Sequence, residues 1–221
     1  MLGVPALLIL KQPDLGTALI CILVAATMLL AVRLRPWVKA AVAAVDLSAA
    51  TVVFLFGLKA YQKKRLLTFL DPSSDPTGSA YHALQSMYAI GSGRWSGKGF
   101  LHGTQNQLQF LPEHWTDFPF AVWAEEWGLA GGLVLLVCYM LLILWALGVS
   151  ATARDRFGQM LAFGVAALLF WHTAINIGMV TGVLPVVGVT LPLFSYGGSS
   201  LLTVLGAIGL LMNVSIRRYS Y

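Results

Sequence analysis

The 221-residue chain has few charged side chains. Only 10% of its residues are Asp, Glu, Lys or Arg, compared with about 25% in typical soluble domains. Hydrophobic residues make up 58%, and the mean hydropathy is +0.78. This shortage of charge excludes an ordinary soluble domain and predicts an integral membrane protein.

Cysteine is also scarce. Cys21 and Cys138 are the two cysteines, they form no CxxC pair, and both fall inside apolar runs. A disulfide framework and a cysteine-based metal site are therefore not expected, and buried packing is the simplest role for both thiols.

The chain has no basic helix with interleaved aromatic residues, although its net charge is +5. In a membrane protein, basic residues mark loops and sites near lipid headgroups. Membrane lipids are therefore expected partners, and nucleic acid is not.

Long apolar runs are abundant instead. A helix needs about 20 mostly apolar residues to cross the hydrocarbon core, and five runs qualify: 16–32, 38–58, 118–150, 157–180 and 199–216. Residues 1–10 are too short to span and lack the features of a signal peptide. We predict an all-α integral membrane protein with about five transmembrane helices in a single membrane domain, 1–221.

The basic residues divide evenly between the two sides of such a protein, but those in the short loops favour a cytoplasmic C-terminus. Alternation of the spans then places three regions together on the outer side. They are the segment around Asp14, the long loop 59–117 and the link 181–198.

These outer regions have unusual composition. The loop 59–117 is rich in Gly, Pro, Ser and Asp, and loops of this length are commonly functional. Residues 79–90 are expected to form a short amphipathic helix. The link "LPVVGVTLPLFSYGGSS" has Pro and Gly at spacings that interrupt a helix, so we expect a re-entrant segment packed within protein.

Four of the nine carboxylates fall within residues 110–128: Glu113, Asp117, Glu125 and Glu126. Asp117 precedes a span, so it suits both a helix N-cap and a catalytic base. An unpaired charge inside a span costs about 2.5–3.5 kcal/mol, so Glu125 and Glu126 are expected to face the protein interior or a wet cavity, and structural pairing is the leading interpretation for both. Glu125, two helical turns beyond Asp117, is the one expected to reach its site.

Several segments resemble a known family. They are "KQPDLGTALI", "YHALQSMYAIGSG", "GKGFLHGTQNQLQFLPE", "TDFPFAVWAEEWGLAGG" and "NIGMVTGVLPVVGVTLPLFSYGGSS". In this order they closely resemble the SEDS family (shape, elongation, division and sporulation), and within it the RodA branch that acts in cell elongation. SEDS proteins have about ten spans, and the resemblance begins near the end of the fifth. The chain is thus expected to be the C-terminal part of that fold.

The resemblance implies a peptidoglycan glycosyltransferase that polymerises lipid II, the undecaprenyl-pyrophosphate-linked disaccharide-pentapeptide. It also implies a location in the bacterial cytoplasmic membrane, with an extracytoplasmic active face. The implied partners are a class B penicillin-binding protein transpeptidase and other membrane proteins of the elongation complex. A non-catalytic scaffold for that transpeptidase and a lipid II flippase are the two alternatives.

The family's essential carboxylate falls on Asp117. Partial desolvation at the mouth of a span makes a carboxylate a stronger base, which suits it to take the proton of the attacking hydroxyl. The expected substrate-binding residues are Asp14, Arg94, Lys98, Gln105, His114 and Glu125. Arg94, Lys98 and the backbone amides of the loop are candidates for stabilising the departing pyrophosphate, and a solvated or headgroup-facing lysine is the alternative. Asp14, which also suits an N-cap, is the candidate for positioning substrate or a bound cation.

The family pattern E-R-H-T-D is altered here to Glu113, His114, Trp115, Thr116 and Asp117, so the arginine is lost and the histidine is shifted. No metal-ligating cluster is recognised, although a divalent cation stays an open alternative. Asp46 lies mid-span without an assigned role. His172 and Asn176 share a helical face and are expected to form interhelical hydrogen bonds.

Overall fold

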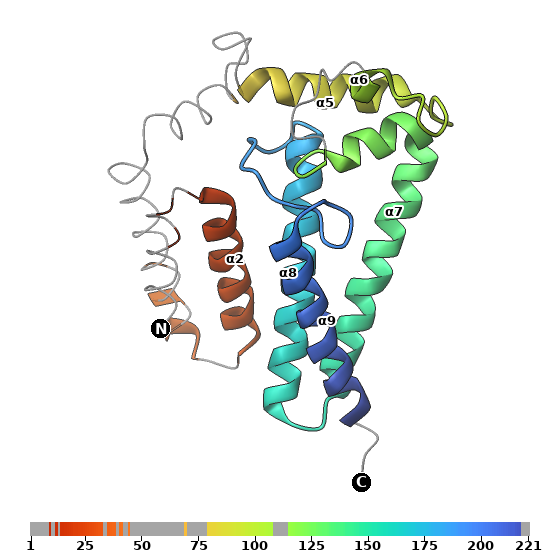
Figure 1. Ribbon diagram of the computed structural model, residues 1–221. Helices are drawn as coiled ribbons and strands as arrows, with labels where there is room; N and C mark the ends of the chain where they lie inside the picture. The colour runs from red at the N-terminus through yellow and green to blue at the C-terminus, as the bar shows by residue number, and fades with distance from the viewer. Residues whose placement is uncertain are drawn as a thin grey trace.

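The computed structural model describes residues 14–32, 79–107 and 115–217, together with isolated positions between residues 9 and 69. Within these ranges all the regular secondary structure is helical (Figure 1). The helices are α2 Leu15–Ala31, α5 Ser79–Gly93, α6 Thr104–Gln107, α7 Pro119–Thr152, α8 Arg156–Val180 and α9 Gly198–Arg217. The short helix expected at 79–90 is therefore confirmed.

Three of these helices, α7, α8 and α9, are long and apolar enough to cross a membrane. They confirm the predicted runs 118–150, 157–180 and 199–216. The run 16–32 also forms a helix, α2, which has 17 residues. The run 38–58 lies largely outside the described residues. The protein is thus an all-α, multi-pass membrane protein.

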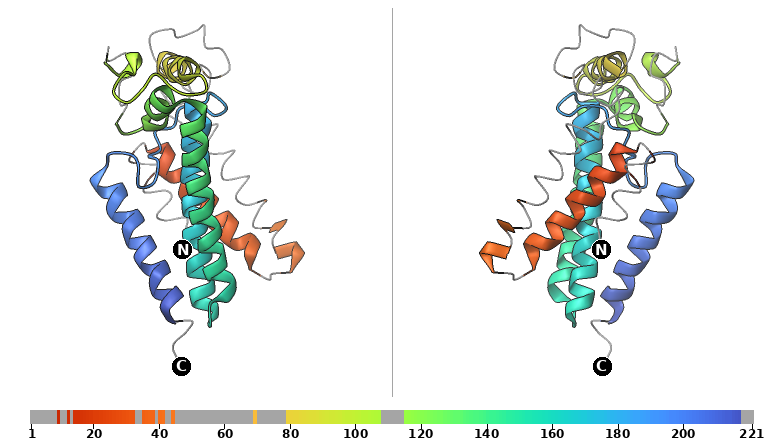
Figure 2. Two further views of the ribbon diagram at one scale, coloured as in Figure 1. Left: turned by 90° about the vertical axis from the view of Figure 1, so that its right-hand side faces the viewer. Right: turned by 90° about the vertical axis from the view of Figure 1, so that its left-hand side faces the viewer.

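Helix α8 is the centre of the bundle and contacts α2, α7 and α9. The side views show α2 and α9 on opposite sides of the α7–α8 pair (Figure 2). Buried small residues such as Ala146, Ala162 and Ala166 allow α7 and α8 to approach closely. Helix α5 lies across the end of the bundle where α7 begins, and its buried Ser86 donates a hydrogen bond to the carbonyl of Val180 at 2.8 Å.

The starts of α2 and α7 differ in their capping. Asp14 accepts from the Thr17 amide at 3.0 Å and caps α2, which confirms its predicted capping role. The capping alternative for Asp117 is wrong. The N-cap of α7 is Phe118, which makes no side-chain cap bond, and Pro119 occupies the first turn, where a missing N–H is tolerated.

Helix α7 is broken at Gly128, a feature that the apolar run 118–150 does not predict. Gly128 has φ 65° and ψ −165°, a conformation accessible chiefly to glycine. At this break, backbone groups of α7 form hydrogen bonds with the segment after α5 instead of with their own helix. Leu129 N donates to Arg94 O at 2.8 Å, and Lys98 N donates to Glu125 O at 3.0 Å. The break therefore docks the loop 94–99 onto α7.

The link between α8 and α9 is non-helical from Gly182 to Gly197 and folds back beside the helices. The hydroxyl of Tyr139, well inside α7, donates to Pro192 O at 2.5 Å, and the His172 ring bonds to Thr190 O at 3.2 Å. Val189 and Leu191 are buried. This arrangement agrees with the predicted re-entrant segment packed within protein.

Candidate functional site

Asp117 lies in a turn between the long loop and α7, where its side chain is half-buried. The buried amide of Asn176, on α8, donates to Asp117 O at 2.9 Å and to Val189 O at 2.6 Å. One amide group therefore fixes the backbone of Asp117 to the link. The interhelical bonds predicted for Asn176 and His172 are corrected here, because both side chains bond to non-helical backbone.

The carboxylate of Asp117 lies against Gly188 of the link. A Cβ atom added at Gly188 would be 3.3 Å from Asp117 Oδ2. On α2, a Cβ atom added at Gly16 would be 2.9 Å from Val187 O. The link at 187–189 is therefore contacted both by the start of α2, which Asp14 caps, and by Asp117. The three regions predicted to share one side of the membrane meet at one end of the bundle.

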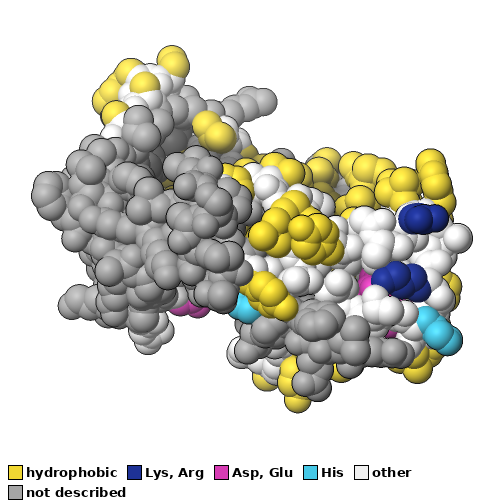
Figure 3. Space-filling model, turned by 90° about the horizontal axis from the view of Figure 1, so that it is seen from above, with side chains coloured by type: hydrophobic (Ala, Val, Ile, Leu, Met, Phe, Trp, Pro, Cys, Tyr) yellow, Lys and Arg dark blue, Asp and Glu magenta, His cyan; other side chains and the backbone are white. Residues whose placement is uncertain are grey.

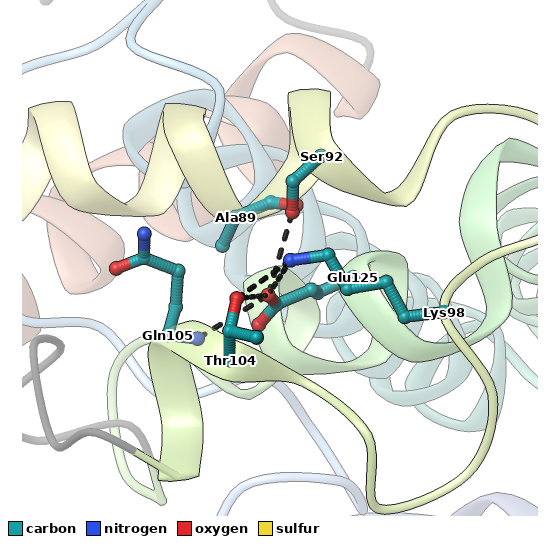
Figure 4. Close-up of polar contacts among 6 residues, drawn as sticks. All are labelled: Ala89, Ser92, Lys98, Thr104, Gln105 and Glu125. Atoms are coloured by element: carbon teal, nitrogen blue, oxygen red, sulfur yellow. Dashed lines mark hydrogen bonds and ion pairs between the residues drawn. The ribbon is translucent and has the colours of Figure 1, made fainter.

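A second polar cluster surrounds Glu125, whose side chain is completely buried (Figure 4). Lys98 Nζ lies 2.5 Å from Glu125 Oε1 and also donates to Thr104 Oγ1 at 2.7 Å. The same carboxylate oxygen accepts hydrogen bonds from Thr104 Oγ1 at 3.1 Å, Gln105 N at 3.2 Å and Ser92 Oγ at 3.4 Å. The pairing predicted for Glu125 is confirmed.

This cluster connects three elements, because Ser92 comes from α5, Thr104 and Gln105 from α6, and Glu125 from α7. The other carboxylate oxygen, Glu125 Oε2, is buried without a hydrogen-bond partner in the described part of the chain. Gly103 lies beside it, and a Cβ atom there would be 2.9 Å away. The Lys98–Glu125 pair thus anchors the loop to the first part of α7.

Glu126 differs from its neighbour. The residue is 7% exposed, and no hydrogen bond or ion pair joins its carboxylate to another residue that the structure describes. The pairing predicted for it is therefore not observed. Glu126 lines a groove of about 560 Å³ between α7, the link and the start of α9. The groove is lined by Trp115, Pro119, Val122, Trp123, Glu126, Leu193, Phe194, Ser195, Tyr196, Gly197, Gly198 and Leu201.

Arg94 is exposed at the end of α5, and no ion pair joins it to another described residue. Seen from above, the described part of this end shows basic and histidine side chains beside apolar surface, with little carboxylate visible (Figure 3). Two other positions singled out from the sequence, His114 and Asp46, lie outside the described residues.

The two cysteines are free thiols. In the described ranges, no group of three or more His, Cys, Asp or Glu side chains is arranged to hold a metal ion.

The family model of the cell cycle proteins FtsW, RodA and SpoVE matches residues 1–220. The chain belongs to this family. The match extends over nearly the whole chain and agrees with the resemblance inferred from the motifs around Asp14, Lys98 and Asp117.

Curated relatives of this family member carry enzyme names. The peptidoglycan glycosyltransferase MrdB of Escherichia coli (strain K12) is 47% identical over 219 residues, which cover 99% of this chain and 59% of the relative. The peptidoglycan glycosyltransferase RodA of Treponema pallidum is 41% identical, with 82% of this chain and 42% of the relative covered. The matched part of the chain therefore spans about two fifths to three fifths of their length.

Two solved structures are similar over almost all of this chain. A peptidoglycan synthase complex, described as coordinating polymerization and crosslinking, matches with a TM-score of 0.74 and 34% identity, covering 97% of this chain and 59% of that one. The rod shape determining protein RodA of Thermus thermophilus matches with a TM-score of 0.56 and 29% identity, covering 98% and 54%. Both likenesses agree with the all-α membrane fold.

Proposed function

We propose that this chain carries the catalytic part of a peptidoglycan glycosyltransferase that polymerises lipid II into glycan strands during cell elongation. The names of its relatives support this reaction. The observation that carries the proposal is the placement of Asp117, whose backbone is fixed by Asn176 and whose carboxylate lies against Gly188. A base must be held in this way to act on a bound hydroxyl.

Asp117 takes the proton of the attacking 4-hydroxyl of one disaccharide in this mechanism. The oxygen then forms the new glycosidic bond at the anomeric carbon of the second substrate, and the bond from that carbon to the pyrophosphate breaks. Undecaprenyl pyrophosphate leaves with the bonding electrons. Asp117 is half-buried, which limits the access of bulk water to the proposed base.

The departing pyrophosphate needs positive charge or hydrogen-bond donors. Arg94 is the first candidate, because it is exposed and its guanidinium is not engaged by another described residue. Lys98 is the second, since its ammonium is already paired with Glu125. His114, Gln105 and Asp14 are proposed to contact other parts of the substrate, and a divalent cation at the pyrophosphate remains an open alternative.

The location and partners follow from the same proposal. The protein acts in the bacterial cytoplasmic membrane, with Asp117 on the extracytoplasmic side. Its partner is a class B penicillin-binding protein transpeptidase, a pairing supported by the likeness to a complex that joins polymerization with crosslinking. Other membrane proteins of the elongation complex and membrane lipids complete the expected surroundings.

The test is polymerisation of lipid II by the chain in liposomes, with and without the transpeptidase. Wild type is compared with Asp117→Asn and with Asp155→Asn, a matched change at the N-cap of α8. Glycan strands that are lost only in Asp117→Asn would support the proposal, and a parallel reaction with EDTA tests the cation. Equal polymerisation by Asp117→Asn would exclude the proposed base. Transpeptidase binding without polymer from wild type would favour the scaffold.

A further inference from the structure

The groove beside Glu126 combines features that have no role in the proposed glycosyl transfer. Its walls are mainly apolar, and Val122, Leu193 and Phe194 are among them. Glu126 is the one acidic residue of the lining, and it is only 7% exposed. A carboxylate in such surroundings is costly unless a cation or several donors compensate it. Since the described residues offer neither, the groove is suited to a ligand that brings a cation.

Aromatic residues indicate where the groove lies relative to a bilayer. Trp115, Trp123 and Tyr196 line it, and Trp115 and Tyr196 are 65% and 79% exposed. Trp and Tyr are enriched at the level of the lipid headgroups. The groove also begins at the first residue of α7, where the apolar span starts. Its ligand is therefore expected to have a cationic group at headgroup level and an apolar part that continues into the membrane.

The size of the groove distinguishes a lipid from a transmembrane helix. Along α7 the lining residues run from Pro119 to Glu126, and on α9 they end at Leu201. At 1.5 Å per residue, the α7 portion is about 10 Å long, compared with a hydrocarbon core of about 30 Å. A partner helix would need a longer seam, whereas a headgroup and the first part of an acyl chain match this length.

We propose that this groove binds a phospholipid with a primary ammonium headgroup, of the phosphatidylethanolamine type. The ammonium pairs with the Glu126 carboxylate between the aromatic side chains, and an acyl chain lies along Val122 and Leu201. An ammonium donates three hydrogen bonds in a compact volume, which suits a narrow carboxylate site better than the neutral hydroxyls of a glycerol headgroup. This site does not depend on the proposed transferase activity.

The experiment measures lipid binding to the purified, delipidated chain in detergent. Phosphatidylethanolamine and phosphatidylglycerol with identical acyl chains are titrated separately, and bound lipid is counted by native mass spectrometry. Wild type is expected to bind phosphatidylethanolamine about tenfold more tightly. Glu126→Gln keeps the shape of the side chain but removes its charge, so this preference should disappear. Asp155→Asn, a carboxylate-to-amide change at the N-cap of α8 and away from the groove, should keep the preference for phosphatidylethanolamine.

A second variant tests the groove in case Glu126→Gln does not fold. Leu201→Trp fills the groove and leaves Glu126 in place, so it should weaken binding of both lipids. Equal binding of the two lipids by wild type would overturn the proposal, and so would an unchanged preference in Glu126→Gln. If Glu126→Gln does not give a monodisperse protein, undiminished phosphatidylethanolamine binding by a folded Leu201→Trp variant would overturn the assignment of the groove.

Discussion

The side-chain amide of Asn176 donates one hydrogen bond to Asp117 O and a second to Val189 O, at 2.9 and 2.6 Å. Asn176 lies on α8, Asp117 precedes α7, and Val189 belongs to the link. A single buried donor group thus joins the segment that holds the proposed base to the segment that faces it. The position of the Asp117 carboxylate therefore depends on this connection as well as on the start of α7.

Replacement of Asn176 by Ala should therefore affect both folding and activity. Two carbonyls lose their donor, and each such loss costs about 1–3 kcal/mol, so the free energy of unfolding should fall by about 2–6 kcal/mol. Lipid II polymerisation should fall as well, because Asp117 loses its anchor. Denaturation in detergent and the polymerisation assay measure the two effects.

Thr173→Val provides the matched control for Asn176→Ala. Thr173 is also buried on α8, and its hydroxyl has no hydrogen-bond partner among the described residues. Removing such a hydroxyl should be nearly neutral or slightly stabilising. If Asn176→Ala were as stable and as active as Thr173→Val, the two hydrogen bonds would not matter for holding Asp117.

The Lys98–Glu125 pair predicts an asymmetry between its two neutralising mutations. Lys98→Met leaves the fully buried carboxylate of Glu125 without its cation and should lower the free energy of unfolding by about 3 kcal/mol. Glu125→Gln should cost less, because Lys98 is 27% exposed and can turn toward water. The double variant should lose less free energy of unfolding than the sum of the losses in the two single variants. A double-mutant cycle measures this difference, and strictly additive losses would show that the pair is not coupled.

The contact between the loop and the break in α7 leaves no room for a side chain at Gly97. A Cβ atom there would be 2.0 Å from Glu126 O, and Gly97 has φ 78°. Because the opposing atoms belong to the backbone and cannot move aside, Gly97→Ala is expected to lower the free energy of unfolding by more than about 3 kcal/mol.

Gly91→Ala on α5 is the control for Gly97→Ala, since nothing lies within 4 Å of the Cβ position at Gly91. This change should stabilise the helix by about 0.5 kcal/mol. Chemical denaturation in detergent measures both variants. Similar unfolding midpoints for the two would show that the loop can shift away from α7 at little cost.

The helices themselves could be predicted because membrane insertion depends on long apolar runs, which a sequence displays directly. The predicted run 157–180 corresponds to α8, which begins one residue earlier at Arg156 and ends at Val180 as predicted. The N-cap at Asp14 was also predictable, since a cap bond is made within one helical turn. Features that depend only on residues close together in the sequence could therefore be predicted.

The site was less predictable because its contacts join distant parts of the chain. That Glu125 needs a partner followed from the cost of burying its charge, but the identity of Lys98, 27 residues earlier, did not. The break at Gly128 depends on backbone bonds to Arg94 and Trp95, which no hydropathy pattern encodes. Asn176 was expected to bond to a neighbouring helix, and its two carbonyl partners in non-helical segments could be identified only from the fold.

Asp14 gives the last prediction, because its capping role and its proposed contact with substrate can be separated. Asn is as good an N-cap as Asp, so Asp14→Asn should leave the free energy of unfolding unchanged. Asp14→Ala removes the bonds to Thr17 and should cost about 1 kcal/mol. If the carboxylate binds substrate or a cation, both variants should lose lipid II polymerisation although only Asp14→Ala is less stable. Full polymerisation by Asp14→Asn would restrict Asp14 to capping α2.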